Sequence, residues 1–378
     1  MKITRFEIYY STLIVLISLL FGVFSIELIY KNFFLDRSFY KWGDRYMLFA
    51  QDGGGTVFKN IGEIFTYQPN ATINSKTYYN IDDGWVVEYE YSFRTNNLGL
   101  VQSSNVGSKI PSILLLGDSY TEGQGSAPWF EILNKNLKNE AHQYVNGGLL
   151  ATGPSQWLSL HNELLRNLKI KKIVAIGISP DYSRVIFNFP KKTLSCIEFY
   201  SVCDGDENFY GLPNKDQEKK YLEKLKSYRE SHYEHHQKLI NTGKSTKQVL
   251  AEFMPASFLI YSNFKSMLGI LPTTDVNVTS NSEAIKTLIE AYGDNFLFIH
   301  LPSKAEIFSG QISPLGRKMK SDIHRFNGNY FDGFSGCNLG KTDFFKNDGH
   351  PNQGGYAKIA KCVEEAIKSR WSLLQVSG

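Results

Sequence analysis

Several signals that would assign a function at once are missing from this chain of 378 residues. It has no glycine-rich phosphate loop and no zinc-type CxxC pair, which argues against a P-loop nucleotide enzyme and a zinc finger. An excess of one charge is also absent. The 41 basic and 37 acidic side chains leave a formal charge of +4, too small at this length to indicate nucleic-acid binding. No internal repeat or low-complexity tract appears, and a 42% hydrophobic, 21% charged composition is typical of a folded globular protein.

Cysteine is scarce, with four residues in two sequence clusters. Cys196 and Cys203 flank a short segment, and Cys337 and Cys362 bracket a later one. An even number arranged in this way fits two disulfides formed in an oxidising compartment. Four unpaired buried thiols would explain the same pattern, so the sequence leaves the disulfide state open.

Long hydrophobic runs are also rare, and the one that stands out lies at the N-terminus. It comprises 19 uncharged residues from Ile8 to Ile26. About 20 apolar residues are needed for a helix to cross the hydrocarbon layer. A cleaved signal peptide usually has an apolar core of about 7–15 residues and a small-residue cleavage site. The exit here, Phe-Ser-Ile-Glu at 24–27, is a poor site. We therefore expect residues 1–30 to form an uncleaved transmembrane anchor, in preference to a signal peptide or a buried soluble helix.

The orientation of this anchor follows from weaker evidence. Lys2 and Arg5 favour an N-terminus on the cytoplasmic side, although Lys31, Arg37 and Lys41 compete with them. A short tail followed by a single span usually exports the chain that follows. We therefore expect a single-pass protein of the cell membrane whose bulk is extracytoplasmic, in the periplasm.

Residues 31–108 form a segment of different character from the rest. Residues 31–45 read as a linker, and strand-like pieces such as 85–91 follow, separated by turn signals such as Asp-Asp-Gly. We interpret 31–108 as a linker and a small β-rich lead-in. It would pack on the main domain or shape its cleft.

Apolar runs alternate with helical patterns from Ile113 onwards. The expected elements are a strand at 113–116, a helix from Pro128 to Leu137, a strand near 144–145, a helix from Ser155 to Leu168, a strand from Lys172 to Ile178, a strand at 295–300 and a last helix from about Gln353 to Trp371. This alternation predicts a doubly wound, flavodoxin-like α/β domain with a parallel sheet over residues 109–378. A charged stretch at about 205–270 interrupts it, and we expect a helical insertion there that could act as a lid.

A candidate nucleophile directly follows the first buried strand. Residues 117–123 read Gly-Asp-Ser-Tyr-Thr-Glu-Gly. A sharp strand-to-helix turn would lift the Oγ of Ser119 above the carboxyl edge of the sheet, where ligands bind in open α/β folds. Backbone N–H groups at such a turn can face a carbonyl oxygen. A plain glycine-bounded turn would read the same way, so the motif needs a partner.

That partner stands just before the last helix, at Asp348-Gly349-His350-Pro351. A serine hydroxyl is a weak nucleophile and needs a base, which in turn needs a group that fixes its tautomer. His350 could be the base and Asp348 could receive its Nδ1 proton. A helix cap with a surface histidine is the alternative. With Ser119 in place, we favour a Ser119–His350–Asp348 catalytic triad.

Together these motifs resemble the SGNH/GDSL hydrolase superfamily, in its membrane-anchored bacterial type, over about residues 110–370. The stretch 146–154, Asn-Gly-Gly-Leu-Leu-Ala-Thr-Gly-Pro, is similar to the second block of that family. The resemblance implies an oxyanion hole formed by the N–H groups of Ser119 and Gly148. Residues 93–100 and 301–304 also resemble stretches of the anchored members.

One block departs from the family pattern. The third block usually supplies an asparagine side chain as a third oxyanion donor, whereas residues 177–181 read Gly-Ile-Ser-Pro-Asp here. Pro180 takes the asparagine position and has no donor. Losing one donor can cost about a hundredfold in turnover. Ser179, Asn146 or another group would have to replace it, or the chain works slowly.

No cofactor and no metal is expected. His232 and His236 share a helix face at a spacing that could hold a metal, but the flanking pattern of a zinc protease is missing, and a solvated face explains them better.

The resemblance implies a serine esterase or O-acyltransferase that uses an acyl-enzyme intermediate. We expect its substrate to be an acyl ester, with acetyl favoured, of a cell-envelope or secreted polysaccharide or another small ester. A membrane acyltransferase could be its partner, and no nucleic-acid partner is expected. The alternative is a catalytically weak glycan-binding or assembly subunit.

Overall fold

The computed structural model describes residues 5–29, 45–81, 84–137, 141–198, 209–211, 222–223, 254, 256–257 and 276–372. The chain divides into two compact units, which are described separately. One comprises residues 1–40 and 223–273, and the other comprises residues 41–222 and 274–378.

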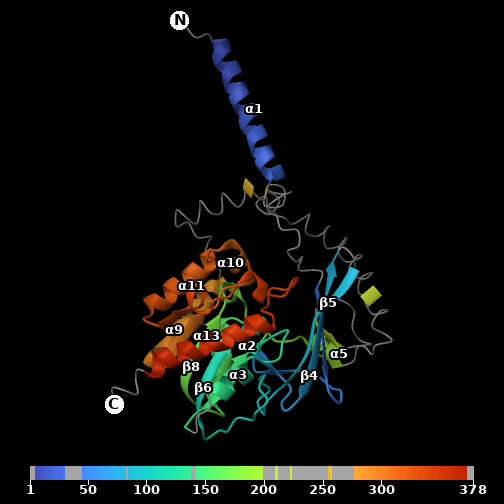
Figure 1. Ribbon diagram of the computed structural model, residues 1–378, viewed down its shortest axis with the longest axis vertical. Coiled ribbons are helices and arrows are strands. Elements are labelled where there is room, and N and C mark those ends of the chain that lie inside the picture. Colours follow the sequence, from blue (N-terminus) through green and yellow to red (C-terminus); the bar gives the residue numbers. More distant parts are fainter. Residues whose placement is uncertain are drawn as a thin grey trace. The chain divides into compact units, whose positions relative to one another are not determined.

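The first unit contains the long helix α1, Arg5–Ile29 (Figure 1). Its segment Tyr10–Ile29 has a mean hydropathy of 2.5, and nearly all of its side chains are unburied. Near its end, the buried carboxylate of Glu27 accepts hydrogen bonds from the N–H groups of Ala256 and Ser257, at 3.0 and 2.7 Å. The predicted N-terminal apolar helix is therefore present, and its length and composition suit a membrane anchor or a signal sequence.

The second unit is built on a five-stranded parallel sheet of order β7-β6-β8-β10-β11. Its strands are β6 (Pro111–Gly117), β7 (Gln143–Gly148), β8 (Lys169–Gly177), β10 (Phe296–His300) and β11 (Asn329–Asp332). Numbered along the chain this is the order 2-1-3-4-5, which defines the flavodoxin-like doubly wound fold. The predicted fold class is confirmed.

Both faces of this sheet are covered by helices, so its central strands are apolar throughout (Figure 1). In β6, Leu114 and Leu116 belong to one core and Ile113 and Leu115 to the other. The first core includes residues of α4 (Pro154–Leu165), α9 (Val276–Tyr292) and α11 (Pro314–Arg325), and the second includes residues of α3 (Phe130–Asn136) and α13 (Gln353–Ser372).

A second, mainly antiparallel sheet has the order β5-β4-β1-β9, and its strands other than β9 precede the parallel sheet in sequence. Its strands are β1 (Arg45–Gln51), β4 (Thr72–Ile81), β5 (Gly84–Arg94) and β9 (Phe209–Gly211), and a hairpin of β2 (Phe58–Ile61) and β3 (Ile64–Tyr67) accompanies it. We call β1, β4 and β5 the N-terminal sheet. The predicted β-rich segment is present.

The N-terminal sheet shares a hydrophobic core with the parallel sheet. Phe49 from β1 and Phe58 from β2 belong to the same buried cluster as Leu116 from β6 and Trp157 from α4. The rings of Phe49 and Phe58 meet edge to face at 5.3 Å. A shared core fixes the position of one sheet on the other within this unit, so the N-terminal sheet is more than a tethered lead-in.

The predicted helical insertion at 205–270 needs a correction at its start. Residues 209–211 form strand β9, which pairs in parallel with β1. The open edge of β1 offers unpaired backbone groups, and pairing satisfies them. The remainder of this prediction, including His232 and His236, falls almost wholly outside the described residues.

Cys337 and Cys362 form a disulfide, as one of the two readings of the cysteine pattern required. It joins the end of α12 (Gly333–Gly336) to α13. Cys203 lies outside the described residues, so the other pair is not described. The shorter elements are α2 (Ser119–Glu122), η2 (Ser179–Ser183), α5 (Lys191–Glu198), η4 (Gly293–Asn295), α10 (Lys304–Ser309) and η5 (Lys341–Asp343).

Candidate active site

Ser119 lies at the turn from β6 to α2, beside the point where the strand order reverses. The turn is tight, because a Cβ atom added to Gly117 would lie 1.9 Å from the Oγ1 of Thr121. Asp118 caps α2 by accepting the N–H of Tyr120 on its Oδ1 at 2.9 Å. Glycine and cap together put Ser119 at the carboxyl edge of the sheet, as the sequence predicts.

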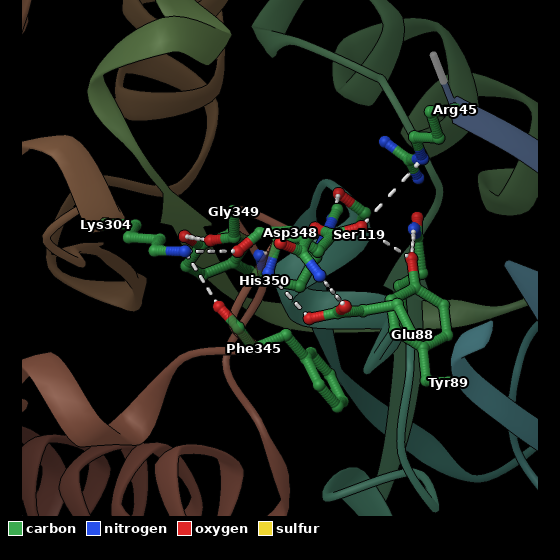
Figure 2. A network of polar contacts seen from close by, with 12 residues as sticks. Arg45, Glu88, Tyr89, Ser119, Lys304, Phe345, Asp348, Gly349 and His350 are labelled. Carbon is green, nitrogen blue, oxygen red and sulfur yellow. Dashed lines mark hydrogen bonds and ion pairs between the residues drawn. The ribbon is translucent and has the colours of Figure 1, made fainter. Parts of the chain in front are cut away.

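In the three residues predicted as a triad, His350 lies within hydrogen-bond reach of both Ser119 and Asp348 (Figure 2). The Oγ of Ser119 is 2.7 Å from the Nε2 of His350. The Nδ1 of His350 is in short contact with the Oδ1 of Asp348, which also accepts the backbone N–H of His350 at 2.9 Å. A carboxylate at Nδ1 holds the proton there, so Nε2 can accept the serine proton. This geometry can activate the hydroxyl for attack on a carbonyl carbon.

Lys304, at the start of α10, holds the loop that carries the histidine. Its Nζ donates to the carbonyl oxygens of Phe345 and Asp348 at 2.7 and 3.1 Å (Figure 2). From α2, the hydroxyl of Tyr120 donates to the carbonyl oxygen of Gly349 at 2.6 Å. These bonds fix the backbone of the loop, and the loop backbone in turn fixes the position of His350.

The second oxygen of Asp348, Oδ2, faces the N-terminal sheet. It accepts the hydroxyls of Tyr79 at 2.6 Å and Tyr89 at 2.9 Å, and the Nε of Arg45 lies 3.9 Å away. Burial by itself raises the pKa of Asp348. The charges of His350 and Arg45 and the hydrogen bonds from His350 and Tyr79 outweigh burial and hold that pKa well below its ordinary value. Asp348 is therefore an ionised acceptor at neutral pH.

The expected role of Gly148 in the oxyanion hole is corrected by the structure. Its N–H already donates to the Oδ1 of Asn146 at 3.0 Å, at the buried end of β7. A Cβ atom at this position would lie 2.3 Å from the backbone nitrogen of Glu122. Glycine is required here because α2 lies directly against the strand, which explains the motif without an oxyanion role.

Ala151 is the better candidate for the second backbone donor. It is exposed in the loop after β7 and has a φ of 59°, a left-handed conformation that is uncommon outside glycine. In the part of the chain that the structure describes, its N–H makes no hydrogen bond, whereas the preceding N–H, of Leu150, donates to Glu122 at 2.7 Å. The N–H of Ser119 is at the first position of α2, where no intrahelical acceptor exists.

Glu122 supports this loop from beneath. Its carboxyl group accepts the N–H of Leu150 and, at 2.9 Å, the hydroxyl of Tyr67. Burial raises the pKa of Glu122 to about 8, despite hydrogen bonds from Tyr67 and Leu150 that lower it. The group is enclosed and touches the loop through its backbone, which is a supporting role that the sequence did not reveal.

Neither group named as a replacement for the missing asparagine is free. Ser179 is buried, donates to Glu306 at 2.5 Å and lies 3.0 Å from the Nε2 of His300. The side-chain amide of Asn146 donates to the carbonyl oxygen of Val101 at 2.8 Å. Pro180 carries no donor group and is exposed, so none of these three positions offers a free side-chain donor.

Arg184 lies close to the nucleophile and was missed by sequence reasoning. Its Nη1 is 3.2 Å from the Oδ2 of Asp118, 3.2 Å from the Oδ1 of Asp181 and 3.1 Å from the carbonyl oxygen of Thr152. The same Oδ2 of Asp118 is 3.3 Å from the Oγ of Ser119. Burial and the charge of Asp118 raise the pKa of Asp181 well above its usual range, against the influence of Arg184. Arg184 is thus the cation that compensates Asp118 beneath the nucleophile.

We expect Arg184→Met to lower the free energy of unfolding by about 3 kcal/mol, because it leaves the buried carboxyl group of Asp118 without its cation. Denaturation of the full chain in detergent would measure this. Arg166 pairs with Glu163 at the surface, so Arg166→Met is the matched control and should cost less than about 1 kcal/mol. Equal effects of the two changes would contradict a compensating role.

Asp348→Asn should lower kcat strongly with little change in KM, because an amide presents the wrong partner to Nδ1 and cannot stabilise the imidazolium. In one well-studied triad this change costs about ten-thousandfold. Asp343→Asn, in the same loop but paired with Lys358, is the control and should leave kcat nearly unchanged. A loss of only a few fold for Asp348→Asn would favour a Ser119–His350 dyad, in which Asp348 only holds the turn by accepting the backbone N–H of His350, a bond that asparagine can also accept.

Comparison with known proteins gives structural similarities only. No protein-family model matches the chain, and no curated protein does. Similar solved structures include a lipase/acylhydrolase from Enterococcus faecalis (12% identity, 69% of this chain and 97% of that one, TM-score 0.36). Also similar is a member of the lipolytic protein G-D-S-L family from Veillonella parvula (12% identity, 68% of this chain and 98% of that one, TM-score 0.33). A third is a GDSL-like lipase from Bacteroides thetaiotaomicron (12% identity, 68% of this chain and 88% of that one, TM-score 0.31). In its motifs and its sheet order the chain resembles the SGNH/GDSL hydrolases.

Proposed function

We propose that this chain is a membrane-anchored serine esterase or O-acyltransferase that acts on an acyl ester of a cell-envelope or secreted glycan. The observation that carries the proposal is the 2.7 Å contact between the Oγ of Ser119 and the Nε2 of His350, at the switch point of a doubly wound sheet. A serine–histidine pair with a carboxylate behind it is the arrangement that makes a hydroxyl nucleophilic.

The chemistry would run through an acyl-enzyme. As His350 accepts its proton, the Oγ of Ser119 attacks the ester carbonyl carbon, and the negative oxygen would face the N–H groups of Ser119 and Ala151. When this tetrahedral intermediate collapses, the ester C–O bond breaks, and His350 gives the proton to the leaving alcohol. The acyl group remains on the Oγ of Ser119. Water then releases the acid, or a sugar hydroxyl takes the acyl group, through the same steps in reverse.

The substrate assignment is supported by the anchor and by the family resemblance, and acetyl is the acyl group that we favour. In the transferase direction, a membrane acyltransferase would be a suitable partner to supply the acyl group. No step of the reaction requires a cofactor. In the described ranges no cluster of three His, Cys, Asp or Glu side chains could hold a metal.

A catalytically weak glycan-binding or assembly subunit is the second candidate. It is favoured by Pro180, which offers no donor, and by the engaged side chains of Ser179 and Asn146. Covalent labelling by a fluorophosphonate probe separates the two candidates, because only an activated serine reacts.

Ser119→Ala should abolish both fluorophosphonate labelling and turnover of a small acetyl ester such as 4-nitrophenyl acetate. The fold should persist, because the change removes a single hydroxyl. Ser126→Ala, a few residues further along and also buried, is the matched control and should label normally. Turnover by Ser119→Ala near the wild-type rate would show that another residue is the nucleophile. Comparing acylation of envelope glycans in cells with the wild type and with Ser119→Ala would then identify the substrate.

The location is tested separately. The chain should stay with membranes through a high-salt wash and leave only with detergent, because α1 is long enough to span. Protease added to the outer face of opened cells should digest the second unit. Digestion only from the cytoplasmic side would reverse the proposed topology, and release by salt would show that α1 is no anchor.

A further inference from the structure

The two carboxylate oxygens of Asp348 have separate partners. Oδ1 faces His350, through the ring Nδ1 and the backbone N–H. Oδ2 accepts two phenolic hydroxyls, from Tyr79 in β4 and Tyr89 in β5. The residues that fix the outer oxygen come from a part of the chain roughly 260 residues away in sequence, in the N-terminal sheet and not in the parallel sheet.

A register shift in the N-terminal sheet brings this contact about. Thr77 pairs with Tyr89 and Tyr78 pairs with Val87, so Glu88 is an extra residue in β5. In a regular strand Glu88 and Tyr89 would point to opposite faces. At the irregularity both reach the catalytic loop: Tyr89 binds Asp348, and the Glu88 carboxylate accepts the backbone N–H and side-chain amide of Asn347, both at 2.7 Å (Figure 2). Bulges that aim side chains in this way are common beside active sites.

The hydroxyl of Tyr89 is itself oriented. The side-chain amide of Gln124, which follows α2, donates to the phenolic oxygen at 2.6 Å. An oxygen that accepts in this way keeps its own proton for Asp348. Tyr89 therefore connects the turn after the nucleophile to the carboxylate behind the base.

We infer that Tyr79 and Tyr89 are positioning residues of the triad: they hold the carboxylate of Asp348 by its outer oxygen so that the inner oxygen meets His350. A buried carboxylate without these donors would keep unsatisfied lone pairs and could rotate. The inference rests on the proposed function, and it makes the N-terminal sheet part of the catalytic unit.

Removal of one donor should change both rate and pH dependence. Tyr79→Phe should lower kcat by about tenfold with KM nearly unchanged, less than the hundredfold that a 1 Å misplacement can cost.

The groups that face Asp348 are His350 in its own loop, Arg45 in β1 and the two tyrosines, with Lys304 on the loop carbonyls. With one donor lost, more of the carboxylate charge acts on the imidazolium and stabilises it. The acidic limb of the kcat/KM profile should therefore move to higher pH, which simple destabilisation would not cause.

Tyr78→Phe is the matched control. Tyr78 is the neighbouring residue of β4 and is equally buried, and its hydroxyl has no hydrogen-bond partner among the described residues. It should leave kcat and the pH profile unchanged. If Tyr79→Phe behaves like Tyr78→Phe, the inference is overturned. If Tyr79→Phe does not fold, Tyr89→Phe provides the same comparison.

A readout without turnover distinguishes this inference from the proposed function. The proton in the hydrogen bond between the Nδ1 of His350 and Asp348 should give a low-field proton resonance, which Asp348→Asn removes. Tyr79→Phe should shift or broaden that resonance, and Tyr78→Phe should not. A chain that turns over no ester but shows this shift would retain the positioning role and lose the enzymatic one. An unchanged resonance in Tyr79→Phe would overturn the positioning role even in an active enzyme.

Discussion

A carboxylate buried behind a histidine is the constraint on which the rest of this site depends. The Asp348 side chain is almost wholly enclosed, and an ionised group in such surroundings is stable only if hydrogen bonds and opposite charge replace the lost water. Its own loop supplies two of these contacts, the backbone N–H and the ring Nδ1 of His350. The N-terminal sheet supplies the others, from Tyr79, Tyr89 and Arg45. The shared hydrophobic core between the two sheets therefore has a chemical consequence, because it sets how firmly the base is held.

A second buried acid meets the same requirement on the other side of Ser119. Asp118 must lie beneath the nucleophile to cap α2, and its other oxygen needs a cation. Arg184 reaches it from the turn after β8, and the backbone of that turn is fixed by Asn281, which donates to the carbonyl oxygens of Tyr182 and Arg184 at 3.1 and 2.8 Å. Two acid–cation pairs from four separate segments, Asp118 with Arg184 and Asp348 with Arg45, thus lie on either side of Ser119 and His350.

The sequence predicted what depends on local pattern. Apolar runs located four of the five parallel strands, whereas the short edge strand β11 has no such run and was missed. The positions of Ser119, Asp348 and His350 relative to strand and helix ends predicted that they would meet at one edge of the sheet. Contacts across the chain left no local signal. Tyr79 and Tyr89 look like ordinary strand residues, and only a one-residue register shift aims them. For Gly148 the resemblance misled, because a glycine required by close packing reads the same as one required for an oxyanion hole. The left-handed backbone of Ala151 could not be predicted either, because alanine rarely adopts a positive φ.

A second serine–histidine–acid set, Ser179, His300 and Glu306, shows what separates a reactive arrangement from a structural one. Its serine and histidine are also within hydrogen-bond reach, with the Oγ of Ser179 at 3.0 Å from the Nε2 of His300. The serine proton, however, goes to Glu306, and the Nδ1 of His300 meets the hydroxyl of Tyr330 at 2.8 Å, not a carboxylate. Burial lowers the pKa of His300 to about 4, against the charge of Glu306, so the ring resists taking up a proton at neutral pH. A base must become charged during attack, and of these two histidines it is His350 that has an ionised carboxylate at its Nδ1 to stabilise that charge. The difference between the two sets therefore lies in the group at the Nδ1 of the histidine. The reactivity of Ser119 thus depends on Asp348 and on the residues that hold its carboxylate.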